Sequence, residues 1–183
     1  MSVNPQEKSQ VPAAFAAPPH GAAIITAIKQ AGVQFVLSVP DIVTSAGLLF
    51  PIAADRSLKL VRVCKEDEAV AISAALSICG KRALLLIQHT GLLDSINAVR
   101  AIAMEYAMPV VMMIGLLEKE AGVPPRESRR YGVRIVEPIL DAMGMNHRLI
   151  ETDADVRVIQ SAIEEAYTQS KPVALLIGQR PRP

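Results

Sequence analysis

The chain has 183 residues, with 19 basic and 18 acidic side chains, and this near balance gives no reason to expect nucleic acid or an anionic membrane as a partner. Hydrophobic residues make up 51% of the sequence and aromatic residues only 3%, which is typical of a parallel sheet of Val, Ile and Leu under Ala-rich helices. No apolar run reaches the length of a membrane span, and residues 1–19 lack the features of a secretory signal. We therefore expect one cytoplasmic domain over 20–183, preceded by a flexible arm over 1–19 that holds four prolines.

Helical and strand patterns alternate along the rest of the chain. The predicted helices are 22–30, 42–54, 65–79, a helix that Gly91 leads into and that runs to 107, 131–143 and 153–169, with bends expected at Pro51 and Pro138. The predicted strands are 33–39, 58–64, 83–88, 109–115, 147–150 and 173–178. Six strands joined by helices indicate an α/β fold with a parallel, doubly wound, flavodoxin-like sheet.

The cysteines and histidines do not suggest a metal site. Cys64 and Cys79 lie in apolar surroundings without a Cys-x-x-Cys partner, so we expect both to be buried free thiols. His20, His89 and His147 are too scattered along the chain to predict metal ligands from their spacing.

An acidic cluster and a histidine stand at two neighbouring strand ends. The strand 58–64, which we expect to be buried, ends at Lys-Glu-Asp-Glu over 65–68, and the strand 83–88 opens into His89, Thr90 and Gly91. Ligands of open α/β sheets collect outside the carboxyl ends of the strands, so Glu66 and His89 are candidate site residues. Each has an ordinary alternative, because acidic residues often cap helices and a histidine after a strand is often a hydrogen-bonded loop residue.

The two motifs together resemble those of a known enzyme family. Lys-Glu-Asp-Glu-Ala-Val-Ala-Ile-Ser-Ala-Ala-Leu from residue 65 and Gln-His-Thr-Gly-Leu-Leu-Asp-Ser-Ile-Asn-Ala-Val from residue 88 resemble the pyrimidine-binding domain of thiamine-diphosphate enzymes. The sulfopyruvate and phosphonopyruvate decarboxylase α subunits are the most similar group, and the resemblance spans residues 21–178.

The resemblance implies catalytic roles for Glu66 and His89. Glu66 takes the place of the glutamate that shares a proton with N1′ of the cofactor's aminopyrimidine, which favours the imino tautomer. The 4′-imine then takes the proton from C2 of the thiazolium, and the resulting carbanion attacks a 2-oxo acid. His89 replaces an Asn of the most similar group but matches an active-site histidine of benzoylformate and pyruvate decarboxylases, where it would transfer protons.

A third strand end carries further candidates. Ser38-Val39-Pro40-Asp41 is similar to a Val-Pro-Asp-Ser segment that faces substrate and cofactor in the decarboxylases, with Ile42 here in place of the serine. Asp41 could equally be a simple cap of the next helix. The contacts implied by the resemblance are Val39, Pro40, Glu66 and Gly91 for the cofactor, and Asp41, Gln88, His89 and Thr90 for the substrate.

The segment after the strand 109–115 departs from the resembling group. Those proteins continue into Trp-Arg-Gly, whereas this chain has Leu116, Leu117 and Glu118, which favours a 2-oxo acid less charged than a sulfonate or phosphonate. A long connection, 116–130, follows and is of a length that often has a function. Its three arginines, at positions 126, 129 and 130, either bind an anion or are solvated.

The chain contains no Gly-Asp-Gly, the motif through which thiamine-diphosphate enzymes hold the diphosphate with Mg²⁺, so we expect no metal ligands here. The resemblance therefore implies the α subunit of a hetero-oligomeric 2-oxo acid decarboxylase, such as an α2β2 assembly, that releases an aldehyde. Its β subunit would carry the diphosphate-binding domain and the Mg²⁺ ligands. A thiamine-diphosphate carboligase or C–C lyase subunit, and a structural or regulatory α/β subunit without catalysis, are the alternatives.

Overall fold

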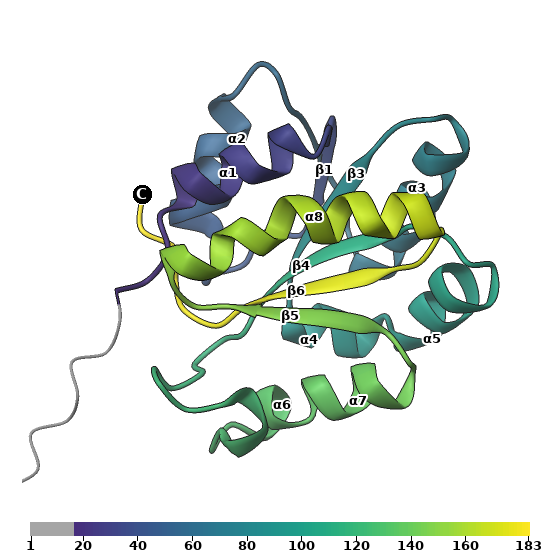
Figure 1. The fold of residues 1–183 in the computed structure, drawn as a ribbon. Coiled ribbons are helices and arrows are strands. Elements are labelled where there is room, and N and C mark those ends of the chain that lie inside the picture. Colours follow the sequence, from purple (N-terminus) through teal and green to yellow (C-terminus); the bar gives the residue numbers. More distant parts are fainter. Residues whose placement is uncertain (1–16) are drawn as a thin grey trace, which may run out of the picture.

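The computed structural model describes residues 17–183 and contains a six-stranded, entirely parallel sheet with helices on both faces (Figure 1). The strand order is β2-β1-β3-β4-β6-β5. This confirms the predicted doubly wound α/β fold. Most of the predicted N-terminal arm, residues 1–16, lies outside the described residues. Within 17–183, no helix combines the length and apolar character needed to cross a membrane.

The elements alternate along the chain as the sequence pattern predicts. The strands are β1 Phe35–Ser38, β2 Lys59–Arg62, β3 Ala83–Gln88, β4 Val111–Gly115, β5 Asn146–Ile150 and β6 Val173–Ile177. The α-helices are α1 Gly21–Gln30, α2 Phe50–Ala54, α3 Glu66–Ile78, α4 His89–Asp94, α5 Ile96–Ala98, α6 Tyr131–Arg134, α7 Val136–Ala142 and α8 Asp153–Gln169. There are also two π-helical segments, η1 Ser45–Leu49 and η2 Val99–Glu105, and a 3₁₀ turn, η3 Pro125–Glu127.

Two apolar layers enclose the sheet. One contains residues of α1, η1, α2 and α8, and the other contains residues of α3, α4, η2, α6 and α7. Along β3, Leu84 and Leu86 belong to the first layer and Leu85 and Ile87 to the second. Successive side chains of a strand point to opposite faces, so a strand covered on both sides is apolar throughout.

The order of the strands along the sheet reverses direction at two places. The chain runs outward from β1 to β2 and then returns to place β3 on the other side of β1; we call the β1–β3 boundary the first switch point. It runs outward again to β5 and returns to insert β6 beside β4, and we call the β4–β6 boundary the second switch point. Open α/β sheets bind ligands outside the carboxyl ends of strands at such reversals.

The edge position of β2 corrects two predictions. The strand over 58–64 was expected to be buried, but β2 pairs only with β1, and Lys59 and Arg62 are exposed. Cys64 and Cys79 are exposed rather than buried. Cys64 follows the edge strand, whereas Cys79 is the C-cap residue at the end of α3. β1 also separates β2 from β3, so the predicted site extends over three strand ends rather than two adjacent ones.

Three helix boundaries differ from those predicted. Helix α4 begins directly at His89, because Gln88 has extended backbone angles and acts as the N-cap without a loop. The segment after β1 becomes helical at Ser45 rather than at Ile42. The predicted helix 131–143 is interrupted between α6 and α7, since Pro138 has no N–H to donate to the carbonyl four residues earlier.

Candidate functional site

Three carboxylates lie in the first turn of α3, and two of them bind backbone N–H groups. Glu68 accepts hydrogen bonds from the N–H of Cys64 at 3.0 Å and of Lys65 at 3.4 Å. Asp67 accepts the N–H of Glu68 at 2.9 Å. Within residues 17–183, Glu66 makes no hydrogen bond through its carboxylate, although its side chain is half-buried. The capping role that Glu66 could have had therefore belongs to its neighbours.

The Glu66 side chain packs against Gly91, the third residue of α4. A β-carbon at position 91 would overlap the carboxyl group of Glu66, so the absence of a side chain there lets the two helices meet. An ion pair of 3.1 Å between Lys65 and Asp94 joins the same two helices at the surface. The Asp94 hydrogen bond, together with nearby negative charge, raises the pKa of Lys65 above its ordinary value. The start of α3 is thus fixed on the first turns of α4.

His89 begins α4 and is only 5% exposed. Its Nδ1 accepts a hydrogen bond from the N–H of Leu117 at 3.2 Å, which leaves the ring proton of the neutral form on Nε2. The Nε2 side faces α6, where a β-carbon on Gly132 would lie 2.9 Å from that nitrogen. Burial lowers the pKa of His89, while the backbone of Gly115 and the charge of Asp41 oppose this change. The neutral imidazole is therefore favoured near neutral pH.

Asp41 caps the helical segment that follows β1. Its carboxylate accepts the N–H of Val43 at 2.6 Å, the N–H of Thr44 at 3.2 Å and the hydroxyl of Thr44. The side chain is buried, and a β-carbon on Gly115 would lie 3.1 Å from its Oδ1. The capping alternative for Asp41 is thus observed, and substrate contact by this residue stays a prediction.

The remaining predicted site residues lie at the same edge of the sheet. Val39 is half-buried and Pro40 is exposed just beyond the end of β1. Gln88, the last residue of β3, accepts a hydrogen bond from the hydroxyl of the exposed Thr90 at 2.9 Å. The structure thus brings the predicted residues to the ends of β1, β2 and β3, around the first switch point.

Sequence patterns missed several groups that surround these residues. Leu117 contributes a backbone N–H, which the sequence does not signal. Gly132 lies within a predicted helix, where an isolated glycine can indicate close packing, and that signal could have identified it. Lys119 and Glu151 form a buried ion pair near the ends of β4 and β5.

Two arginines of the connection 116–130 form ion pairs within the chain. Arg126 contacts Glu137 at 3.2 Å and also pairs with Asp141, and Arg130 lies 2.8 Å from Glu118. Two of the three arginines, for which anion binding and solvation were the alternatives, therefore already have acidic partners within the chain.

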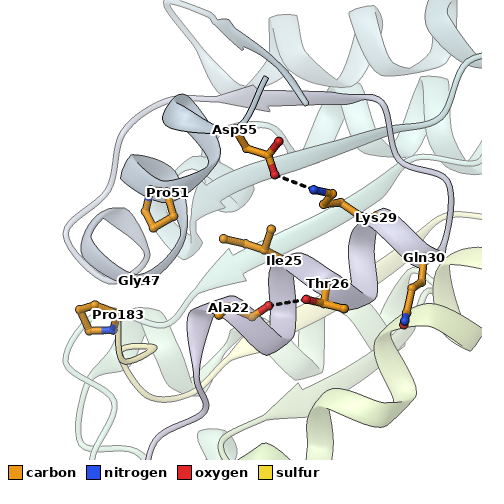
Figure 2. Close-up of a pocket in the computed structure, with 9 residues that line it drawn as sticks. All are labelled: Ala22, Ile25, Thr26, Lys29, Gln30, Gly47, Pro51, Asp55 and Pro183. Atoms are coloured by element: carbon orange, nitrogen blue, oxygen red, sulfur yellow. Dashed lines mark hydrogen bonds and ion pairs between the residues drawn. The ribbon is translucent and has the colours of Figure 1, made fainter. Parts of the chain in front are cut away.

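A groove of about 770 Å³ lies between α1 and the η1–α2 segment (Figure 2). These elements cover the face of the sheet opposite to the one that α3 and α4 cover. The ion pair of Lys29 with Asp55 lies toward one end of the groove and Pro183 toward the other. The full lining is Ala22, Ile25, Thr26, Lys29, Gln30, Gly47, Pro51, Asp55 and Pro183, and it includes no predicted site residue. In the described part of the chain, no three His, Cys, Asp or Glu side chains gather into a metal-binding group.

Comparisons with known proteins agree with the predicted resemblance. The chain is 29% identical over 160 residues to the sulfopyruvate decarboxylase subunit alpha of Methanocaldococcus jannaschii, covering 84% of this chain and 90% of that protein. It is 26% identical over 160 residues to the subunit of the same name from Methanococcus maripaludis, covering 85% and 92%. The sulfopyruvate decarboxylase of Methanosarcina acetivorans is 23% identical over 184 residues, covering 97% of this chain but 41% of that protein. No protein-family model matches the chain.

Proposed function

We propose that this chain is the α subunit of a heteromeric, thiamine-diphosphate-dependent 2-oxo acid decarboxylase that releases an aldehyde without oxidation. The observation that carries this proposal is the hydrogen bonding of the carboxylates in the first turn of α3, and of Glu66 in particular. It is the one carboxylate of the first turn of α3 that makes no backbone hydrogen bond, and Gly91 leaves room for it beside α4. The names of the relatives agree with a decarboxylase subunit.

The chemistry of Glu66 fits the pyrimidine end of the cofactor. A carboxyl group without an internal partner can share a proton with a ring nitrogen, whereas Glu68 and Asp67 are already used to bind N–H groups. When bound, thiamine diphosphate supplies the electron sink that decarboxylation of a 2-oxo acid needs. The role of Glu66 in this proposal is to hold the pyrimidine in place and to exchange one proton with it.

His89 is proposed to act as a neutral hydrogen-bond donor. Because the N–H of Leu117 occupies Nδ1, the ring proton of the neutral form is on Nε2. Burial lowers the pKa of the ring, so the doubly protonated form is disfavoured at neutral pH. A donor of this type can stabilise negative charge that develops on a substrate oxygen.

The diphosphate end of the cofactor is proposed to bind a partner subunit. Mg²⁺ requires several oxygen ligands, and residues 17–183 hold no cluster of acidic and histidine side chains suited to a metal. The Methanosarcina acetivorans relative, of which this chain covers 41%, has room for a second unit in one polypeptide. In the present protein that second unit is proposed to be a separate β chain with a Gly-Asp-Gly motif and the Mg²⁺ ligands.

The proposed substrate is a 2-oxo acid whose side group is less charged than a sulfonate or phosphonate. The position after β4 has Leu116, which is buried, and Glu118, which pairs with Arg130, in place of an arginine. These residues provide no free cation for a sulfonate at that point. Profiling of 2-oxo acids with neutral and anionic side groups, with product analysis, would separate decarboxylation from carboligation or C–C cleavage.

The central test is a pair of substitutions in the first turn of α3. Glu66→Gln in the complex of this chain with its β subunit keeps the size of the side chain but removes its proton exchange. We expect aldehyde release to fall by roughly 10²-fold or more, as for the loss of a general acid–base group. The measurement is kcat on a 2-oxo acid at saturating cofactor.

Glu68→Gln is the matched control, because it alters a carboxylate of the same turn that only caps the helix. It should lower the free energy of unfolding by about 1 kcal/mol and leave kcat within a fewfold of wild type. Wild-type kcat in Glu66→Gln, or equal losses in the two variants, would defeat the assignment of Glu66.

A further inference from the structure

Lys119 and Glu151 form a buried ion pair at the second switch point. The side chain of Lys119 is 0% exposed and that of Glu151 is 20% exposed. The ammonium of Lys119 also donates to the carbonyl of Glu120 at 3.0 Å. A β-carbon on Gly178, just beyond β6, would lie 2.7 Å from Oε1 of Glu151, so this glycine makes room for the pair. The pair joins the ends of β4 and β5 across the end of β6.

Lys119 is also the last residue of a tight turn over residues 116–119. Leu116 donates its N–H to the carbonyl of Ile177 at 3.0 Å, and Lys119 donates its N–H to the carbonyl of Leu116 at 3.3 Å. Glu118 has a φ of 60°, a left-handed conformation that a residue with a side chain adopts only when its surroundings impose it. Between these points, the N–H of Leu117 is directed at Nδ1 of His89.

We propose that Lys119 is a positioning residue, whose buried pair with Glu151 holds the turn 116–119 in place and thereby keeps the proton of His89 on Nε2. The route is short, because Lys119 is only two residues from Leu117, the donor to the ring. Removal of the pair releases the strained turn, and Leu117 then no longer selects one tautomer. Only the catalytic meaning of His89 rests on the proposed function; the coupling between Lys119 and His89 does not.

The surroundings of His89 determine how its pKa should change when the turn 116–119 opens. The backbone of Gly115 and the charge of Asp41 favour the protonated ring, and burial opposes it. Opening of the turn admits water to the ring and removes the N–H that stabilises the neutral form. Both changes raise the pKa of His89 toward its ordinary value near 6.5.

The experiment is an NMR measurement on the full-length ¹⁵N-labelled chain without cofactor. Ring nitrogen shifts report the tautomer and the pKa of His89, and His20 and His147 are assigned by substitution to Gln. In Lys119→Met we expect both His89 tautomers to be populated, its pKa to rise, and the Leu117 amide to exchange roughly tenfold faster or more.

The control is Lys29→Met, which breaks an ion pair of 2.7 Å between Lys29 and Asp55 on the other face of the sheet. It should leave the His89 ring unchanged. If Lys119→Met does not fold, Glu151→Gln is measured in its place and should shift His89 in the same direction.

An unchanged His89 spectrum in the folded variant would overturn the proposal. So would an equal loss of amide protection throughout β3, because the pair would then stabilise the whole fold and not the turn. Neither result depends on Glu66 or on any cofactor, so failure of this proposal is distinguishable from failure of the proposed function.

Discussion

Both switch points of the sheet have a glutamate packed against a glycine, but only one of the two glutamates has a partner for its carboxylate within residues 17–183. Near each, a glutamate that follows one strand packs against a glycine that follows another: Glu66 after β2 against Gly91 after β3, and Glu151 after β5 against Gly178 after β6. Glu151 is paired with the buried ammonium of Lys119. Glu66 has no hydrogen-bond partner for its carboxylate within residues 17–183.

The paired Glu151 fits a structural role, whereas the half-buried carboxyl of Glu66 fits a chemical role. A buried charge pair satisfies its own hydrogen-bonding groups and leaves nothing for a ligand, although its loss exposes an uncompensated charge. A half-buried carboxyl without a partner keeps its capacity for an outside group. The first switch point is therefore the one at which we propose catalysis, and the second is the one that we propose to position Leu117 and His89.

The largest expected effect is at the second switch point. Glu151→Gln leaves the buried ammonium of Lys119 without its counter-charge, and we expect the free energy of unfolding to fall by about 3 kcal/mol. The double variant Lys119→Met with Glu151→Met removes both charges and should recover most of that loss. Urea denaturation of the three chains measures both values, and a double variant as unstable as the single one would contradict the explanation.

Gly91→Ala tests the first switch point. The added β-carbon overlaps the Glu66 carboxyl, which must move away from α4. Because a displacement of about 1 Å in a catalytic group can cost roughly 10²-fold in rate, we expect a kcat loss of that order in the complex with the β subunit. Gly178→Ala is the comparison, and its main effect should be on stability. If both variants lost kcat by a similar factor for a similar loss in the free energy of unfolding, the two switch points would not differ in function.

Asp41→Ala removes the cap of the helical segment after β1. Its carboxylate accepts hydrogen bonds from Val43 and Thr44, so we expect a loss of about 1–2 kcal/mol in the free energy of unfolding. The KM for the 2-oxo acid then decides whether Asp41 also contacts substrate. Asp41→Asn, which keeps one acceptor oxygen, should recover part of the stability, and a full loss in this variant too would show that the charge matters more than the cap.

The buried His89 predicts a dependence of stability on pH. Its pKa in the folded chain is lowered by burial, so the unfolded chain binds the proton more readily. Stability is therefore fully present above the ordinary histidine pKa of about 6.5 and falls as the pH decreases below it. Urea titrations from about pH 7.5 to 5 should show this fall, and His89→Gln should flatten it. An equal slope in that variant would assign the effect to other groups.

The smallest expected effect is that of Lys65→Gln. The ion pair of Lys65 with Asp94 joins α3 to α4, but both side chains are more than half exposed. Solvent and salt screen such pairs, so the free energy of unfolding should stay within experimental error of wild type. A clear loss of stability or of kcat would mean that this surface contact, and not Gly91, holds Glu66 in position.

Local signals in the sequence identified most of the fold. Helix α8 over Asp153–Gln169 and strand β3 over Ala83–Gln88 have the predicted bounds, because each carries its own apolar period and end signals. The exposed Cys64 was predicted wrongly because the order of strands, and hence the edge position of β2, is not encoded in any single segment. Periodicity identifies a strand but not its neighbours.

The candidate site was identified only in part for the same reason. Glu66 and His89 were predicted from their places after strands, and the sequence offered three carboxylates for one role. The resemblance selected Glu66 among them, but which of the three accepts backbone N–H groups is a property of the folded backbone that the sequence did not predict.

The sequence by itself determined the alternation of helices and strands, the parallel sheet and the edge at which polar side chains gather, because these follow from local periodicity and from the ends of strands. Only the tertiary structure decided that Glu66 packs against Gly91 without a hydrogen-bond partner among residues 17–183, that Leu117 donates to Nδ1 of His89 and that Lys119 meets Glu151. These contacts join residues that are 25, 28 and 32 positions apart in the sequence. They arise when crossovers bring separate strand ends together, which no local pattern specifies.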